Sequence, residues 1–148
     1  MTYYIYLENG TLNGAGEAIL LTEGVVNIEV TEEVYNGYVT EPEKYIYSDG
    51  EIVENPNYAE EQAQNERNRL DMLSLTKREV FLALYKDKGL TPEQLRSKIT
   101  DPEALIEFDY ANDYYRGNPL INKIGEMLGY TIEDLDYLFE NKELPAKE

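Results

Sequence analysis

A seven-residue pattern occurs twice in the second half of this chain of 148 residues, and it limits what that half can fold into. The two copies read GLTPEQL at 89–95 and GYTIEDL at 129–135. Glycine often ends a helix in the left-handed conformation, and threonine followed three residues later by an acidic or amide side chain caps the next helix. Each copy therefore predicts two short helices, which meet at Gly89 and Thr91 or at Gly129 and Thr131.

Further helix start signals surround the two copies. Thr76 and Glu79 have the spacing of a capping box, and proline follows Asp101 and Asn118 at the first position of a helix. These signals predict a bundle of about five short helices in the last part of the chain, residues 74–148.

Two details of this bundle are expected. Residues from about 77 to 99 and from about 119 to 140 form two similar helical hairpins. The middle helix begins at Pro102, and its inward-facing side chains are expected to be Leu105, Phe108, Asn112 and Tyr115.

Residues 1–56 carry the signals of strands and turns. Their tyrosine and apolar side chains favour strands, and Asn9-Gly10 and Asp49-Gly50 are strong hairpin turns. Thr31, followed by two acidic residues, is expected to cap one short helix. The expected strands cover residues 2–7, 17–21, 25–30, 44–47 and 51–53, and the helix covers 32–39. We therefore predict a small antiparallel sheet with one helix for this part.

A polar segment separates the two halves. Asn55-Pro56 ends the strand-rich part, and the sequence YAEEQAQNERNRLD that follows, Tyr58–Asp71, is polar on nearly every helical face. We expect it to be a linking helix. The predicted organisation is α+β, with a β domain at 1–56, a polar linking helix at 57–73 and a helical bundle at 74–148.

The chain contains no cysteine and no histidine. Disulfides, thiolate chemistry and the histidine-based sites of most enzymes are therefore excluded. Asp109 and Asp113 have the spacing to share a cation, but without a full set of oxygen ligands we interpret them as part of a solvated acidic face. We expect a protein that is not an enzyme, with no catalytic residue, no metal site and no cofactor.

The formal net charge is −17, and it is unevenly distributed. Residues 1–66 contain 14 acidic side chains and one basic side chain, whereas residues 67–98 contain eight basic and four acidic side chains. Because a strongly negative chain repels nucleic acid, direct nucleic-acid binding is not expected. A membrane partner is not expected either, since no run of apolar residues approaches the roughly 18 that a spanning helix needs.

The helical hairpins also have the rhythm of a helix–turn–helix DNA reader. In the second hairpin, however, the second helix carries acidic side chains that would oppose the DNA phosphates: Glu133, Asp134, Asp136 and Glu140. The first hairpin offers Arg96 and Lys98 in the same place. A regulator that works through these two cations is our third hypothesis for function.

Tyrosine is abundant, with 14 tyrosines and no tryptophan in the chain. Tyrosine joins a large contact area to a polar tip, which suits protein interfaces, but tyrosines that alternate along a strand also simply cover a sheet. Both interpretations stay open. The candidate protein-contact residues are Tyr45, Tyr47, Tyr110, Tyr114, Tyr115 and Arg116.

The order of the segments resembles that of a class of phage proteins. The N-terminal strands are followed by KYIYSDGEIVENPNY at 44–58, then by EEQAQNERNRL at 60–70 and LSLTKREVFLALYKDKG at 73–89. This layout is similar to that of small tail-fibre assembly or tail-accessory proteins, which bacteriophages and prophages encode near their tail genes. The similarity is clearest from about Tyr45 to Gly89.

The resemblance implies a protein that binds other virion proteins, during assembly or in the particle. The expected partners are other phage or host proteins, with a homo-oligomer as a further option. The expected location is the cytoplasm of the bacterial host during infection, or the virion itself. Such proteins are not known for catalysis, so no catalytic residue is carried over.

A second hypothesis rests on the acidic charge. Small acidic phage proteins without cysteine include anti-CRISPR-like inhibitors of host defence nucleases, some of which imitate nucleic acid. Spaced carboxylates could occupy the basic groove of such a nuclease. The candidate acidic face consists of Glu32, Glu33, Asp49, Glu51 and Glu54. The net positive segment 67–98 argues against it, because a mimic needs a continuous negative face.

Overall fold

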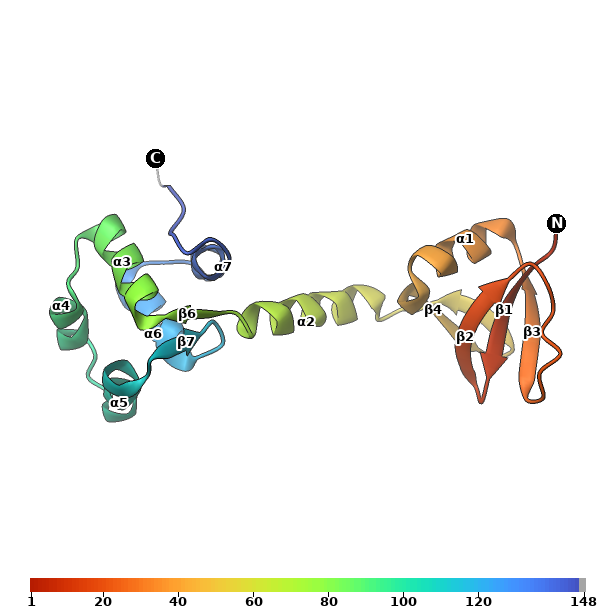
Figure 1. Cartoon of the computed structure of the whole chain (residues 1–148), viewed down its shortest axis with the longest axis horizontal. Coiled ribbons are helices and arrows are strands. Elements are labelled where there is room, and N and C mark those ends of the chain that lie inside the picture. Colours follow the sequence, from red (N-terminus) through yellow and green to blue (C-terminus); the bar gives the residue numbers. More distant parts are fainter. Residues whose placement is uncertain (147–148) are drawn as a thin grey trace. The chain divides into compact units, whose positions relative to one another are not determined.

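The computed structural model describes residues 1–146 of the chain and has an α+β fold (Figure 1). Its contacts divide the chain into two compact units, residues 1–63 and residues 64–148. We call them the β unit and the helical unit. In the described part of the chain, no helix has the length and apolar character required to cross a membrane.

The β unit is built on a three-stranded antiparallel sheet. Its strands are β1 (Tyr3–Glu8), β2 (Thr11–Gly16) and β3 (Val25–Val30), in the order β2-β1-β3. The β1–β2 turn has positive φ at Asn9 (51°) and at Gly10 (78°), as a type I′ hairpin turn requires. The Asn-Gly signal therefore marks a hairpin, as predicted.

One helix, α1 (Glu32–Thr40), packs on this sheet. Thr31 caps it by accepting a hydrogen bond from the Val34 amide, which confirms the predicted start. Ile5, Leu7 and Tyr38 are buried, and the Tyr38 hydroxyl accepts a hydrogen bond from the Gly14 amide at 3.1 Å. The side of β1 that faces α1 therefore forms the small core of the β unit.

The strand predicted at 17–21 is wrong. Strand β2 covers residues 11–16 instead, and residues 17–21 lie outside every strand. The glycines of β2 are needed where they are, because a Cβ on Gly16 would lie 2.2 Å from the Tyr6 hydroxyl oxygen. Strand propensities favour apolar residues over glycines. We therefore predicted this strand too far toward the C-terminus.

A second hairpin follows the short 3-10 helix η1 (Pro42–Lys44). Its strands are β4 (Tyr45–Ser48) and β5 (Glu51–Glu54), and the predicted Asp49-Gly50 turn has positive φ at both residues. The Tyr45 ring lies against α1, since a Cβ on Gly37 would be 2.1 Å from the Tyr45 hydroxyl oxygen. The hairpin is thereby packed on α1.

The polar helix α2 (Tyr58–Asp71) has the predicted bounds, but it is not a separate segment. The division between the two compact units falls inside it, between residues 63 and 64. On the first side of this point, Gln62 donates a hydrogen bond to Glu43 in the β unit. On the other side, Leu70 is buried in the helical unit. These contacts replace the predicted boundaries at 56 and 73.

The helical unit contains the five predicted helices. They are α3 (Lys77–Lys88), α4 (Pro92–Ser97), α5 (Pro102–Tyr110), α6 (Pro119–Leu128) and α7 (Ile132–Asn141). Thr76, Thr91 and Thr131 each form a capping box, the first with Glu79. Gly89 and Gly129 end α3 and α6 in the left-handed conformation. The two predicted hairpins are therefore α3–α4 and α6–α7.

Two short strands of this unit have no counterpart in the prediction. Strands β6 (Ser74–Thr76) and β7 (Asp113–Tyr115) pair antiparallel. Helix α5 accordingly ends at Tyr110, and Tyr115 lies on a strand and is 58% exposed, so its predicted inward position on a helix is wrong. The cause is Tyr114, which is fully buried opposite Leu75 and donates its hydroxyl to the Phe108 carbonyl at 3.0 Å.

Candidate protein-contact surfaces

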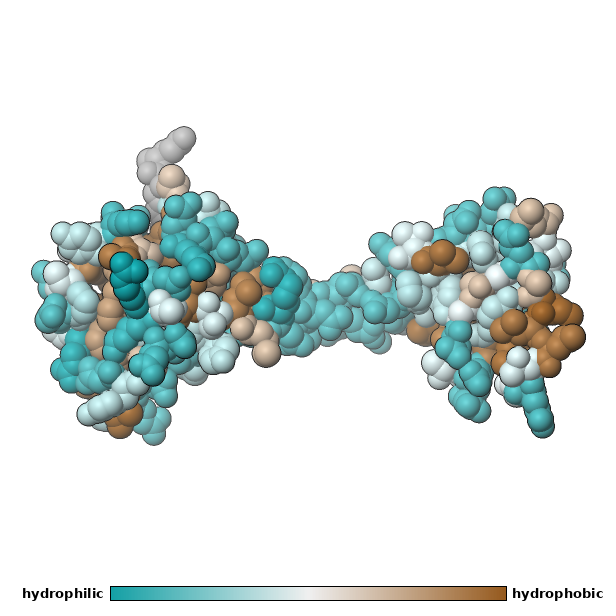
Figure 2. Space-filling model, in the orientation of Figure 1, coloured by the Kyte–Doolittle hydropathy of each residue, from teal (hydrophilic) through white to brown (hydrophobic). Residues whose placement is uncertain are grey.

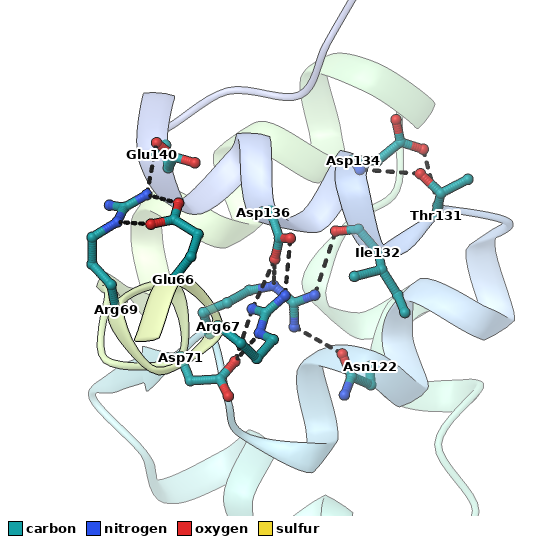
Figure 3. A network of polar contacts seen from close by, with 11 residues as sticks. Glu66, Arg67, Arg69, Asp71, Asn122, Thr131, Ile132, Asp134, Asp136 and Glu140 are labelled. Atoms are coloured by element: carbon teal, nitrogen blue, oxygen red, sulfur yellow. Dashed lines mark hydrogen bonds and ion pairs between the residues drawn. The ribbon is translucent and has the colours of Figure 1, made fainter. Parts of the chain in front are cut away.

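A network of ion pairs and hydrogen bonds between side chains connects three segments of the helical unit (Figure 3). The Asp136 carboxylate on α7 accepts hydrogen bonds from both terminal nitrogens of Arg67 on α2, each at 3.0 Å. It also accepts one from Arg116 Nε, after β7, at 2.6 Å. Arg116 donates in addition to the Asn122 side chain and to the Ile132 carbonyl. The carboxylate therefore joins α2, α7 and the segment after β7.

The electrostatics of Asp136 follow from this arrangement. Burial by itself would raise its pKa, but the hydrogen bonds from Arg67 and Arg116 outweigh burial, and the pKa is lowered. Arg116 is only 2% exposed. Its role is thus to pair with Asp136 inside the unit, and its predicted place on a protein-contact patch is wrong.

The predicted contact tyrosines divide into buried and exposed ones. Tyr114 is fully buried, and burial raises its pKa to about 12, so it does not belong to a contact surface. Tyr45 is half-buried against α1. Tyr47, Tyr110 and Tyr115 remain exposed, by 37%, 80% and 58%. The structure therefore does not assemble the six predicted residues into one patch.

The acidic candidates are all exposed and lie in the β unit: Glu32, Glu33, Asp49, Glu51 and Glu54. Residues 1–63 contain 13 acidic side chains and one basic side chain. The ion pairs of the described chain all join residues of the helical unit, so the carboxylates of the β unit are not neutralised by pairing.

Sequence reasoning missed an exposed apolar loop between β2 and β3. Ile19, Leu20 and Leu21 are 53%, 41% and 92% exposed, and Val26 on β3 is 55% exposed. We call these four residues the apolar loop. Figure 2 shows apolar side chains gathered on the surface of the β unit. The signal in the sequence was three consecutive large apolar residues, which do not alternate as a half-buried strand requires.

Two side chains hold the backbone of the segment between β2 and β3. The Tyr6 hydroxyl donates a hydrogen bond to the Ala18 carbonyl at 2.7 Å, and Asn27 binds Leu20. The Asn27 amide oxygen on β3 accepts a hydrogen bond from the Leu20 backbone amide at 2.7 Å. The Asn27 amide nitrogen donates to the Leu20 carbonyl at 2.9 Å. Both backbone groups of Leu20 are thus occupied by the same side chain. Exposed apolar side chains that are fixed in this way are typical of surfaces that bind another protein.

A second apolar surface lies on α3. Successive turns of this helix bring Phe81, Leu82 and Tyr85 together, and Leu82 and Tyr85 are 41% and 56% exposed. Lys77 and Arg78 edge it at the start of the helix, and Pro92 of α4 completes it. We call these six residues the α3 surface.

The cations near the α3 surface differ from most other described cations because they lack ion pairs. Six of the described lysine and arginine side chains have no ion pair with a described carboxylate, and five of them fall between residues 77 and 98: Lys77, Arg78, Lys86, Lys88 and Lys98. Lys77 instead donates to the Asp109 carbonyl, and Lys88 lies over the Tyr130 ring at 4.9 Å from its centre. The α3 surface is therefore apolar with a cationic edge.

The remaining candidate sites are the DNA-binding cation Arg96 and the metal-binding carboxylate Asp109. Both Arg96 Nε and Nη2 donate to the Asp109 carboxylate at 2.8 Å, and these hydrogen bonds lower the pKa of Asp109. Arg96 is thereby paired with an acid and poorly placed to bind DNA phosphates, and Asp109 is occupied by a cation of the chain itself. Among the described residues there is no group of three or more acidic side chains placed to hold a metal ion.

Comparisons with known proteins give one match. A family model described as protein of unknown function (DUF2977) matches residues 37–62. This segment runs from the end of α1 through the β4–β5 hairpin into α2, and it contains both Gly37 and the Tyr45 ring packed on it. No curated protein and no solved structure matches the chain.

Proposed function

We propose that this chain is a non-enzymatic, phage-encoded protein-binding module, which acts as a tail or tail-fibre accessory or assembly protein. The observation that carries the proposal is the apolar loop. Large side chains at residues 19–21 are exposed to water at a free-energy cost, and Asn27 holds the backbone of the middle one, Leu20, in place. A partner that covers them removes apolar area from water without first having to order the loop.

The proposal assigns Leu21 the central contact. It is 92% exposed, so it contributes little to the stability of the free chain, and truncating it leaves the fold intact. Loss of a large apolar anchor at an interface commonly weakens binding by about tenfold or more. The variant Leu21→Ser therefore separates binding from folding.

Affinity capture tests this function. The tagged full-length chain is expressed in cells that are assembling the phage, and the bound proteins are identified by mass spectrometry. We expect phage tail proteins among the specific partners, with recovery reduced about tenfold by Leu21→Ser. Val39→Ser is the matched control, because Val39 is 58% exposed and lies on α1, not in the apolar loop. Equal recovery by both variants, or no tail protein among the partners, contradicts the proposal.

A second candidate function, the inhibition of a host defence nuclease, is favoured by a different observation. The 13 acidic side chains of residues 1–63 take part in none of the ion pairs of the described chain. The basic segment that argued against a mimic begins at residue 67, in the other compact unit. The β unit alone therefore has the charge that a basic groove attracts.

This alternative has its own test. The double variant Glu51→Lys, Glu54→Lys reverses two exposed charges on the β unit, and Glu93→Lys, Glu126→Lys makes the same change on exposed residues of the helical unit. If the chain is an inhibitor, we expect it to capture a nuclease and to protect the DNA substrate from cleavage. We expect only the first double variant to lose these two activities. If both double variants protect the DNA equally, the acidic β unit is not the inhibitor.

A further inference from the structure

We infer that the apolar loop of one copy of the chain binds the α3 surface of a second copy, in a head-to-tail arrangement. The inference rests on the proposed function in one respect, because it uses the same apolar loop. The inference goes beyond the proposed function because it identifies a partner, the chain itself, and the surface on which that partner binds.

The loop has the chemistry of a ligand for such a surface. Three of its four apolar side chains, at residues 19–21, are flanked in sequence by Glu17 and Glu23, which are both exposed and take part in none of the described ion pairs. It therefore presents an apolar centre between two negative charges. A binding site for it needs an apolar face with positive charges at its edge.

The α3 surface has that chemistry. Phe81, Leu82 and Tyr85 supply the apolar face, and Lys77 and Arg78 supply the cationic edge. Arg78 is exposed and has no ion pair with any described carboxylate. In a chain of net charge −17, such a combination of apolar and unpaired basic side chains is unusual.

The repeat explains why this surface is open. In the second hairpin, Gly125 on α6 allows Leu135 of α7 to pack directly on it, since a Cβ there would lie 2.7 Å from a Leu135 methyl group. The corresponding residue in the first hairpin, 40 positions earlier, is Tyr85. Gly125 is buried, whereas Tyr85 is 56% exposed, so this face of α3 is not covered as the equivalent face of α6 is. The α3 surface is thus available to a different chain.

Charge also selects the head-to-tail orientation. Two copies carrying −17 each repel one another overall, and a loop-to-loop contact would bring four carboxylates together. Only contact with a cationic surface offsets this repulsion, and the α3 surface provides Lys77 and Arg78, neither of which has an ion pair with a described carboxylate. A loop of this size covers a small area, so we expect weak association, with a dissociation constant of roughly tens to hundreds of micromolar.

Mixing two defective variants tests the arrangement. Leu21→Ser removes the loop contact but keeps the α3 surface, and Arg78→Glu does the reverse. By sedimentation velocity, we expect the unmodified chain to associate with rising concentration and each variant alone to associate about tenfold more weakly. An equimolar mixture of the two is expected to form a 1:1 heterodimer, because each variant supplies the surface that the other lacks.

Controls make the result specific. Val39→Ser and Lys98→Glu change exposed residues outside the two surfaces and are expected to associate like the unmodified chain. Association of Arg78→Glu at the unmodified strength, or a mixture that stays monomeric, overturns the inference. A chain that is monomeric at all concentrations but still captures tail proteins through Leu21 overturns the inference alone, whereas loss of both activities overturns the proposed function as well.

Discussion

At the scale of single residues, Asp136 connects three segments of the helical unit. Its carboxylate accepts hydrogen bonds from Arg67 and Arg116, and its side chain is only 17% exposed. Removing one partner from such a group leaves buried charges without compensation, which costs far more than the loss of a surface ion pair.

We predict that Asp136→Asn lowers the free energy of unfolding by about 3 kcal/mol at pH 7. Because the pKa of Asp136 is lowered below its ordinary value of 3.8 in the folded state, its stabilising effect is present above that value and is lost as the pH falls through the folded pKa. Urea unfolding at pH 7 and near pH 2 measures the effect.

The control for this prediction is Glu133→Gln, which makes the same change on an exposed neighbour and should alter stability by less than about 0.5 kcal/mol. We expect the difference between Asp136→Asn and the unmodified chain to shrink at the lower pH. A difference that stays constant between the two pH values would show that the charge of Asp136 is not the cause.

Which residues serve in this network could not be predicted from sequence. Nothing local distinguishes Asp136 from the acidic residues around it, and its arginine partners come from distant segments of the chain. Arg116 and Tyr114 lie among acidic and aromatic side chains, which suggested a surface, but the pairing of β7 with β6 turns them inward. Burial of this kind depends on tertiary contacts, which a local pattern does not contain.

At the scale of elements, the features predicted most accurately are those that depend on residues close together in the sequence. The hydrogen bonds of Thr76, Thr91 and Thr131 with the third residue of each helix depend only on nearby residues, so the sequence predicted all three starts. The Asp49-Gly50 turn is predictable for the same reason. The three-residue strands β6 and β7 were missed because such short segments show no periodicity.

The caps lead to a prediction for the two hairpins. Thr91→Ala and Thr131→Ala should each destabilise the helical unit by about 1 kcal/mol, because each leaves a helix amide without its acceptor. Thr100→Ala is the control, since Thr100 is exposed and lies between α4 and α5, outside both helices. Urea unfolding followed by circular dichroism measures all three variants, and equal stabilities for the cap and control variants would contradict the role of the caps.

At the scale of the whole molecule, the two compact units have separate cores of different size. The buried apolar residues described in the β unit are Ile5, Leu7 and Tyr38, whereas the helical unit has a large core that includes Leu75, Leu84 and Leu138. The general α+β architecture was predicted from composition and turn signals, but the division at residues 63 and 64 was not, because it depends on which unit each half of α2 contacts.

We therefore predict that the two units unfold in separate thermal transitions, with the β unit first, because it buries less apolar surface. Calorimetry should show two transitions. Methyl NMR signals of Ile5 and Leu84 should assign the lower transition to the β unit and the higher one to the helical unit. Loss of both signals in one shared transition would mean that the chain unfolds as a single cooperative body.

The central claim is that the chain works by binding other proteins through its apolar loop. Photo-crosslinking tests this claim most directly, with benzoyl-phenylalanine placed at residue 21 or, as a control, at residue 39, in cells that are assembling the phage. We expect residue 21 to form crosslinks to identified phage tail proteins and residue 39 to form none of them. The absence of any crosslinked protein at residue 21, or the same products from both positions, would contradict the claim.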